Sequence, residues 1–237
     1  MQSQSAPATP NDTLTRIIIK TIITFIIGVI VIGAILFLLA GSFNYWQAWI
    51  FTIVFNLGLV TQSMYLAIKD PALLERRKNL APAEESTKQK ILLFMGLGSL
   101  FGLILFSGLD YRFGWSHMPP IISLVGDALI ALSFIVYIIV FKENSFAASS
   151  IQTFEDQTVI STGLYGIVRH PKYVGDLILT LGMILALGSW WGLIFFVITI
   201  LALAWRILDE EQLLKHDLPG YEDYTHKVRY RLVPYLW

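Results

Sequence analysis

The sequence predicts an all-α, polytopic integral-membrane helical bundle, and three observations support that fold class. Hydrophobic residues make up 55% of the 237 residues and charged residues only 14%, and the mean hydropathy is +0.64. The apolar residues are gathered in long runs, which is typical of membrane segments rather than of a soluble domain. The basic residues lie almost entirely in alternate loops, as expected of a chain that crosses a membrane several times.

The apolar runs predict about six membrane segments, because a helix needs about 20 apolar residues to cross the hydrocarbon core. The last two runs form a helical hairpin, since Gly188–Gly192 combines a tight turn with two tryptophans of the kind found at membrane interfaces. The fifth run is the weakest of the six because it contains Asp176. The predicted segments are about 17–40, 46–68, 91–109, 119–141, 174–187 and 190–208.

The distribution of charge predicts the orientation. Sixteen of the 17 Lys and Arg residues fall at the start of the first segment, in the second and fourth loops, or after the last segment, whereas Arg112 alone lies on the other side. By the positive-inside rule, both termini and these loops are expected to be cytoplasmic. Acidic residues also number 17, so the net charge is zero and no nucleic-acid partner is indicated. The absence of Cys excludes disulfides, thiolate metal ligands and a Cys nucleophile.

The chain divides into three regions. Residues 1–15 are polar and rich in Ser, Pro and Thr, and we expect a disordered tail. Residues 16–141 hold four N-terminal transmembrane segments, the first of which is too long for a signal peptide and is expected to be a retained anchor. Between the second and third of these segments, residues 69–90 form a charged connector, for which we expect a short amphipathic helix. Residues 142–237 contain the remaining hairpin and most of the polar clusters.

A first polar cluster begins the fifth segment. Pro171 suits the first turn of a helix, so Arg169 and His170 flank the N-terminus of that helix. Such a position can hold an anion, for example a carboxylate or a phosphate. Tyr165 and Tyr173 add rings with polar tips nearby. The same residue types also serve as interfacial anchors, and on these residues alone that alternative stays open.

A second polar cluster ends the sixth segment, where ionisable residues indicate a functional site. Arg206 and Glu210 are one helical turn apart and face the same way, although a salt bridge that closes the helix would explain this pair equally well. Asp209 and Glu211 point elsewhere on the helix and are expected to be solvated. The two helices of a hairpin are antiparallel, so the start of the first and the end of the second lie at the same membrane face. We therefore expect His170 and Arg206 to lie within side-chain reach.

Other polar residues give weaker indications. Asp176 follows Tyr173 by about one turn and is placed to face the same site, while Asp127 and Tyr137 are positioned to pair with other helices. The histidines lack metal-ligand spacing, so we predict no metal site. There is also no P-loop, and no glycine-rich dinucleotide fingerprint follows a strand.

Together the two clusters resemble the isoprenylcysteine carboxyl methyltransferase family of integral-membrane enzymes and the wider phospholipid-methyltransferase group. The pattern is Gly-x-Tyr-x-x-x-Arg-His-Pro-x-Tyr-x-Gly, then a hairpin, then Arg-x-x-x-Glu-Glu and Gly-Tyr-x-x-Tyr. It covers about Ser145 to Pro234. The resemblance implies that residues 142–237 form a catalytic region with a cytosolic S-adenosylmethionine pocket and a C-terminal lid. It also implies a lipophilic substrate that enters from the bilayer.

The resemblance also implies roles for individual residues. Arg206 matches an arginine that meets the substrate, and we predict it to be both substrate-binding and catalytic. Gln152 is the nearest equivalent of an upstream cofactor-binding glutamine, but an insertion or deletion leaves that assignment open. The predicted cofactor-binding residues are Gln157, Thr158, Val159, Ile160, Tyr165, His170, Pro171, Lys172, Tyr173 and Glu210.

The implied reaction is O-methylation of an isoprenylcysteine-like carboxylate. A sulfonium methyl donor is an activated electrophile, so the protein mainly has to align the nucleophile and exclude water. A carboxylate is already ionised, and Arg206 could hold it through charge-assisted hydrogen bonds. An amine nucleophile would have to lose a proton, which makes Glu210, Asp176 and His170 candidate bases.

Three alternatives remain open. The first is a lipid or small-molecule N- or S-methyltransferase. The second is a membrane reductase of the sterol-reductase type, whose NADPH would call for more basic residues than the three found in residues 142–172. The third is a non-enzymatic membrane protein such as a small transporter, although transporters place polar groups at the bilayer midplane rather than at one face. Under each of these alternatives we expect membrane lipids as partners, and we expect the protein to bind neither a metal nor a nucleic acid.

Overall fold

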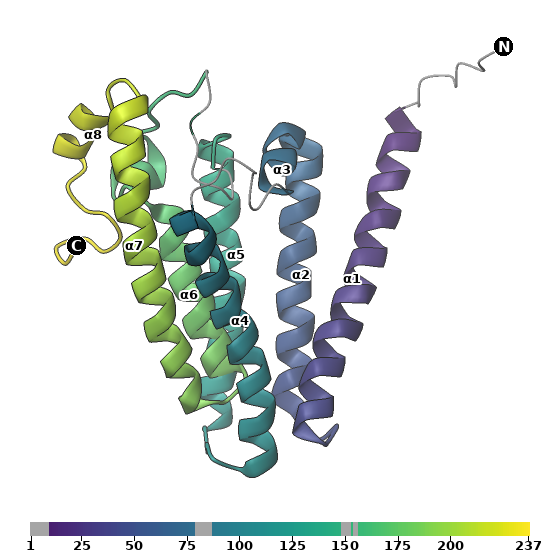
Figure 1. Ribbon diagram of the computed structural model, residues 1–237. Helices are drawn as coiled ribbons and strands as arrows, with labels where there is room; N and C mark the ends of the chain where they lie inside the picture. Colours follow the sequence, from purple (N-terminus) through teal and green to yellow (C-terminus); the bar gives the residue numbers. More distant parts are fainter. Residues whose placement is uncertain (1–9, 79–86, 148–152, 154–155) are drawn as a thin grey trace.

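The computed structural model describes residues 10–78, 87–147, 153 and 156–237, and every regular element in these ranges is helical. The long helices form a bundle (Figure 1), which confirms the all-α part of the prediction. The elements are α1 (Pro10–Ala40), α2 (Trp46–Lys69), α3 (Pro71–Lys78), α4 (Thr87–Phe113), α5 (Pro120–Glu143), η1 (Gly163–Gly166), α6 (Pro171–Ala186), η2 (Trp190–Gly192), α7 (Leu193–Asp217) and α8 (Tyr221–Lys227).

Within the described ranges, five helices are long and apolar enough to cross a membrane, where the apolar runs predicted about six segments. They are α1 from Ile17 onward, α2, α4, α5, and α7 together with η2. The predicted segment 174–187 corresponds to α6, which has 16 residues. At 1.5 Å per residue this helix is about 24 Å long, less than the roughly 30 Å of a hydrocarbon core. The sidedness of the termini stays a prediction.

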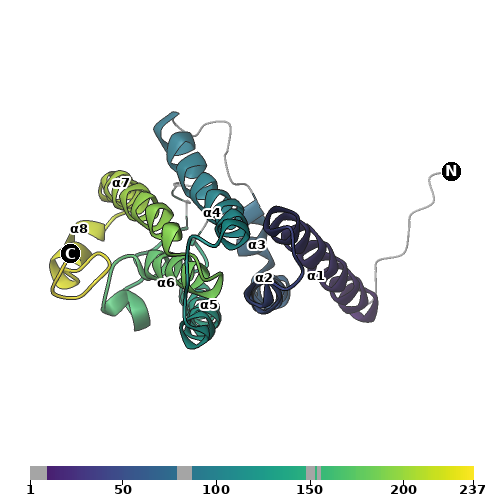
Figure 2. The same cartoon turned by 90° about the horizontal axis from the view of Figure 1, so that it is seen from below.

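The helices pack in a continuous arrangement that Figure 2 shows end-on. α6 lies along α5 and also contacts α7, while α4 packs against α1 and α7, and α2 against α1 and α5. The outer surface of the bundle is apolar: Ile22, Ile30 and Leu201, for example, are each more than half exposed. Exposed aliphatic side chains of this kind are suited to contact lipid tails rather than water.

The start of α1 corrects the predicted extent of the N-terminal tail. The helix begins at Pro10, so residues 10–15, which we expected in the disordered tail, are helical. Proline is well tolerated in the first turn of a helix, where its missing N–H has no partner to lose. Residues 1–9 lie outside the described residues.

The predicted amphipathic connector contains α3, an eight-residue helix. Asp70 precedes the helix, and its Oδ1 atom accepts a hydrogen bond of 2.9 Å from the backbone N–H of Leu73. An Asp before the helix and Pro71 in its first position form a favourable start. The rest of the connector, residues 79–86, lies outside the described residues.

Two glycines allow α5 and α6 to approach closely. A Cβ atom on Gly126 would lie 2.2 Å from the backbone nitrogen of Ala186 and 2.7 Å from the carbonyl oxygen of Gly182. A Cβ atom on Gly182 would in turn lie 3.0 Å from the carbonyl oxygen of Gly126. Small residues have this role at many helix contacts in membranes. The contact fixes the position of α6 and therefore of the polar residues at its N-terminus.

We expect Gly126→Ala to lower the thermal stability of the detergent-solubilised protein, because the added methyl group meets backbone atoms that cannot move aside. The cost should be about 1–3 kcal/mol, as for other overpacked sites. Gly96→Ala is the matched control, since a Cβ atom there meets nothing within 4 Å. Thermal unfolding followed by circular dichroism measures the difference, and equal midpoints for the two variants would contradict the tight α5–α6 contact.

Candidate functional site

A pocket lies among residues at the start of α6, in the last turns of α7 and in α8. Figure 1 shows α8 next to the end of α7, at one end of the bundle. The space between these residues is about 850 Å³, part of which is open to solvent. Five parts of the chain contribute to it: the residues after α5, the segment before η1, η1 itself with the start of α6, the last turns of α7, and α8. The lining residues are Asn144, Phe146, Ala147, Gln157, Thr158, Val159, Ile160, Tyr165, Arg169, His170, Lys172, Tyr173, Arg206, Glu210, Leu213, Leu214, Leu218, Tyr221 and Tyr224.

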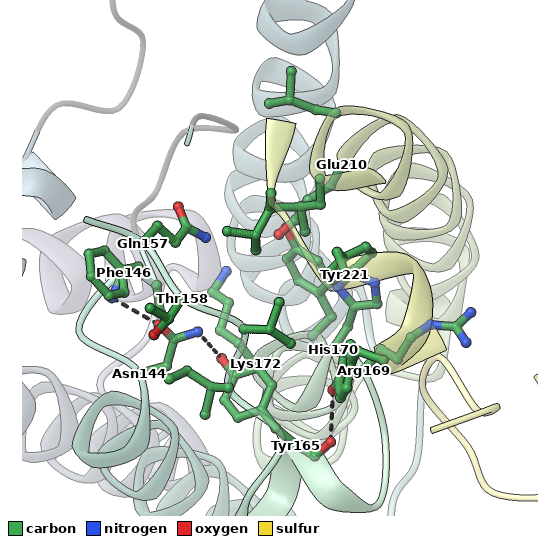
Figure 3. A pocket seen from close by; sticks show the side chains of 18 of the residues that line it. Asn144, Phe146, Gln157, Thr158, Tyr165, Arg169, His170, Lys172, Glu210 and Tyr221 are labelled. Carbon is green, nitrogen blue, oxygen red and sulfur yellow. Dashed lines mark hydrogen bonds between the residues drawn. The ribbon is translucent and has the colours of Figure 1, made fainter. Parts of the chain in front are cut away.

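The structure brings nearly all of the predicted site residues together in this pocket. Nine of the ten predicted cofactor-binding residues line it, as does Arg206. Pro171 does not line it but is buried as the first residue of α6. Figure 3 shows Gln157 and Thr158 on one side of the pocket and Glu210 and Tyr221 on the opposite side. Gln152 lies outside the described residues.

The C-terminal segment, residues 228–237, holds the start of α6 in place. The backbone N–H of Arg169 donates to the carbonyl oxygen of Tyr230 at 2.9 Å, and that of His170 donates to the carbonyl oxygen of Arg231 at 3.0 Å. His170 is the residue before α6, and Pro171 follows it. The position of the His170 side chain is therefore determined jointly by the helix start and by the C-terminal segment.

Tyr173 joins the two predicted clusters. The Nε atom of Arg206 donates to the Tyr173 hydroxyl at 2.9 Å, and this hydroxyl donates to Oε2 of Glu210 at 2.5 Å. The His170 ring stacks on the Tyr173 ring with 5.6 Å between centroids. Arg206 and Glu210 therefore share a face of α7, and His170 and Arg206 lie close together, as their spacing predicts.

The expectation that Glu211 is solvated is wrong. Its side chain is only 5% exposed and accepts hydrogen bonds from Nε of Arg169 at 2.7 Å and from Nε of Arg231 at 3.0 Å. Its Oε1 atom also lies 3.2 Å from Nε2 of His170. The C-terminal segment covers the side of α7 next to the pocket, and this contact could not be inferred from α7 alone. Asp209, by comparison, is partly exposed.

The anion that Arg169 binds in the structure is a carboxylate of the chain itself, that of Glu211. Besides Glu211, its guanidinium binds the carbonyl oxygens of Val228 at 2.9 Å and Arg229 at 3.1 Å. Figure 3 shows the side chain pointing away from Gln157 and Thr158 on the far wall. Arg169 therefore lines the pocket while its guanidinium joins the C-terminal segment to α7.

Neutral hydrogen-bonding groups from tyrosines and an asparagine line another part of the pocket. The Nδ2 atom of Asn144 donates to the Tyr165 hydroxyl at 3.0 Å, and the Tyr224 hydroxyl donates to the Tyr165 carbonyl oxygen at 2.7 Å. Burial raises the pKa of both the Tyr165 and the Tyr224 phenol above the usual value, so both stay uncharged at neutral pH. The sequence prediction missed Asn144, whereas the Gly-Tyr-x-x-Tyr pattern could have indicated Tyr221 and Tyr224.

The weaker predictions have mixed outcomes. Asp176 lies outside the pocket lining, where it accepts hydrogen bonds from Nζ of Lys172 at 2.9 Å and from the Tyr137 hydroxyl at 2.7 Å. This confirms that Tyr137 pairs with another helix. Asp127, which is 6% exposed, does not pair with another helix in the described part of the chain. Neither of its carboxylate oxygens has a hydrogen-bond partner among the described residues.

We expect Glu211→Ala to destabilise the C-terminal segment strongly, because it leaves the Arg169 guanidinium buried without its carboxylate. Removing one partner of a buried ion pair costs about 3–5 kcal/mol. Limited proteolysis and thermal unfolding in detergent measure the effect. Glu222→Ala on the exposed face of α8 is the control, and an equally small effect for both variants would show that the buried network does not stabilise this end of the molecule.

Two comparisons with known proteins bear on this site. Residues 121–218 match the family model of phospholipid methyltransferases. The matched segment runs from the start of α5 to the end of α7 and includes His170, Tyr173, Arg206 and Glu210. A partial match is also found to the Delta(14)-sterol reductase TM7SF2 of Mus musculus, which is 33% identical over 91 residues. That alignment covers 37% of this chain and only 22% of the reductase.

Proposed function

We propose that this chain is an S-adenosylmethionine-dependent membrane methyltransferase, because residues 121–218 match the family model of phospholipid methyltransferases. The five candidate spans agree with a multi-pass membrane protein. The observation on which the proposal mainly depends is the hydrogen-bonded series Arg206–Tyr173–Glu210, which places a cation and a carboxylate in one pocket.

The pocket residues suit the two chemically different ends of S-adenosylmethionine. The wall formed by residues 157–160 combines amide and hydroxyl groups with Val159 and Ile160, which suits an adenosine moiety. Glu210 offers a carboxylate for an ammonium group. When bound, the cofactor would supply an activated methyl group. Residues 142–237 would form the catalytic region on the cytoplasmic face, with α8 as part of the cover that excludes water.

We favour O-methylation of a carboxylate on a lipophilic substrate, such as an isoprenylcysteine-like group. A carboxylate needs no general base, and a guanidinium such as Arg206 can hold it by charge-assisted hydrogen bonds. The candidate bases are already engaged: Asp176 by Lys172 and Tyr137, Glu210 by Tyr173, and His170 by Glu211. N- or S-methylation of a lipid or small molecule is the alternative, and it would require one of these contacts to open.

The partial match to a sterol reductase supports a second candidate function, an NADPH-dependent membrane reductase. Such an enzyme would have to bind the phosphates of NADPH through basic side chains. Of the three basic residues that line the pocket, Arg169 is occupied by Glu211 and two carbonyl oxygens. We therefore rank the reductase below the methyltransferase.

Calorimetry with the purified, detergent-solubilised protein distinguishes the two functions. We expect S-adenosylmethionine to bind, and His170→Ala and Glu210→Ala to weaken binding about 10- to 100-fold, since hydrogen bonds to charged groups contribute about 1.5–3 kcal/mol. Asp209→Ala, which changes the neighbouring carboxylate outside the pocket lining, should bind the cofactor normally. Binding of NADPH in place of S-adenosylmethionine would reject the methyltransferase.

We expect Arg206→Ala to lower kcat/KM for a carboxylate substrate about 10- to 100-fold through the loss of charge-assisted hydrogen bonds. Cofactor affinity should change little, because the Glu210 carboxylate remains. Steady-state kinetics with isotope-labelled S-adenosylmethionine, together with calorimetry, separate the two effects. If the variant lost cofactor binding and kept its KM for the lipid, Arg206 would belong to the cofactor site instead.

A further inference from the structure

A second pocket lies at the opposite end of α6 from the pocket described above. Three connections contribute to it: the turn between α1 and α2, the loop between α4 and α5, and the turn after α6. Figure 1 shows the first two of these at the end of the bundle away from α8. The space between the lining residues is about 970 Å³, part of which is open to solvent. The 16 residues of α6, or about 24 Å of helix, separate the two pockets.

Asp110 contributes a buried carboxylate to the lining of the second pocket. The residue is 2% exposed, and its Oδ1 atom accepts a hydrogen bond of 2.7 Å from the backbone N–H of Ser116. Its Oδ2 atom accepts from the hydroxyls of Ser116, at 2.7 Å, and of Ser189. All three donors are uncharged, and no described residue forms an ion pair with Asp110. A buried carboxylate of this kind attracts a cation, because no charge of the chain compensates it.

The protein itself provides no such cation among the described residues that line the second pocket, since none of them is a lysine or an arginine. The nearby Arg112 is exposed, and its Cζ atom lies 6.0 Å from the centre of the Phe113 ring. In the described part of the chain there is also no group of three or more His, Asp or Glu residues that could hold a metal ion. An organic cation therefore suits the pocket better than a metal ion does.

Two aromatic rings lie in the same lining. Tyr45 and Tyr111 stack with 4.2 Å between their centroids and 17° between their planes. The Tyr45 hydroxyl donates to the carbonyl oxygen of Leu187 at 2.5 Å, which fixes the ring against the end of α6. Aromatic rings attract cations electrostatically, and they are the usual partners of quaternary ammonium groups in proteins. The rings and the Asp110 carboxylate thus favour the same kind of ligand.

Two polar atoms beside the turn after α6 have no hydrogen-bond partner among the described residues: Oε1 of Gln47 and Oγ of Ser123. Gln47 lines the pocket, and Ser123 is fully buried. A Cβ atom on Gly188, which also lines the pocket, would lie 3.4 Å from Nε2 of Gln47 and 3.7 Å from Oγ of Ser123. Buried polar atoms in proteins normally have a partner, so this part of the lining can accept further hydrogen bonds.

We propose that the second pocket binds a quaternary ammonium group, either of a small solute such as choline or of a lipid head group. Asp110 would supply the opposite charge, Tyr45 and Tyr111 the aromatic surface, and Gln47 a polar acceptor. A quaternary ammonium group has no N–H to donate, which suits a carboxylate whose oxygens already accept three hydrogen bonds. The site is separate from the proposed methyl-transfer site, which lies at the other end of α6.

The test uses the full chain in a non-ionic maltoside detergent and two matched pairs of probes. Choline is compared with neohexyl alcohol, its uncharged isostere, and dihexanoylphosphatidylcholine is compared with dihexanoylphosphatidylglycerol. Dissociation constants are measured by calorimetry. Binding of choline would identify a solute as the ligand, and binding of the phosphatidylcholine without binding of choline would identify a lipid head group. In either case the second member of the pair should not bind.

Three variants test which residues hold the ammonium group. We expect Asp110→Asn to weaken its binding about tenfold, because the variant removes the negative charge and keeps the shape of the side chain. Gln47→Glu should strengthen the binding, because it adds a second negative charge to the lining. Glu210→Ala is the control: it removes a carboxylate from the pocket at the start of α6 and should bind the ammonium probe like the parent chain.

Any of four results would overturn the inference: no binding of either ammonium probe, equal binding of the charged and uncharged members of a pair, unchanged affinity in Asp110→Asn, or a loss of affinity in Glu210→Ala. The last result would place the probe in the pocket at the start of α6. Thermal unfolding shows whether Asp110→Asn misfolds, since Asp110 also binds the turn at Ser189. In that case Gln47→Glu decides: tighter binding supports the site, and unchanged or weaker binding rejects it.

Discussion

The buried carboxylate of Glu211 is the interaction on which the architecture of the site depends. It binds Arg169 at the entrance to α6 and Arg231 in the C-terminal segment, and it contacts His170. Three parts of the chain that are remote in sequence thus meet at one side chain of α7. Charges buried in this way are tolerated only when they are paired and hydrogen-bonded. Glu211 meets that requirement through its three partners, and one of these, Arg169, also donates hydrogen bonds to two carbonyl oxygens.

This network also determines what the neighbouring residue can do. Because Glu211 is turned toward the C-terminal segment, the helix directs Glu210 toward the pocket and the Tyr173 hydroxyl. Adjacent carboxylates in α7 therefore have different tasks: the first is part of the pocket and the second is part of the scaffold. His170 contacts both sets of residues, since its ring stacks on Tyr173 and its Nε2 atom meets Glu211.

Much of the site could be predicted from the sequence, because its spacing reflects local helix geometry. Arg206 and Glu210 share a face since they are four residues apart, and Pro171 marks the start of α6. The roles of Glu211 and Arg169 could not be predicted in the same way, because they depend on how residues 228–237 fold back onto α7. The predicted segment 174–187 differs from α6 at both ends, since the helix already begins at Pro171. Its apolar run continues to Leu187, but the helix ends at Ala186 and leads into the turn at Gly188.

The short α6 has a consequence for how two reactants of opposite solubility could meet. α7 continues for 25 residues, whereas α6 has only 16, so a site at the start of α6 can lie at the depth of the lipid headgroups while α7 extends beyond it. For a methyltransferase built in this way, the lipid partner would arrive by lateral diffusion and the cofactor from the aqueous phase. Turnover would then follow the mole fraction of substrate in the membrane surface rather than its bulk concentration, and dilution with inert lipid would slow the enzyme.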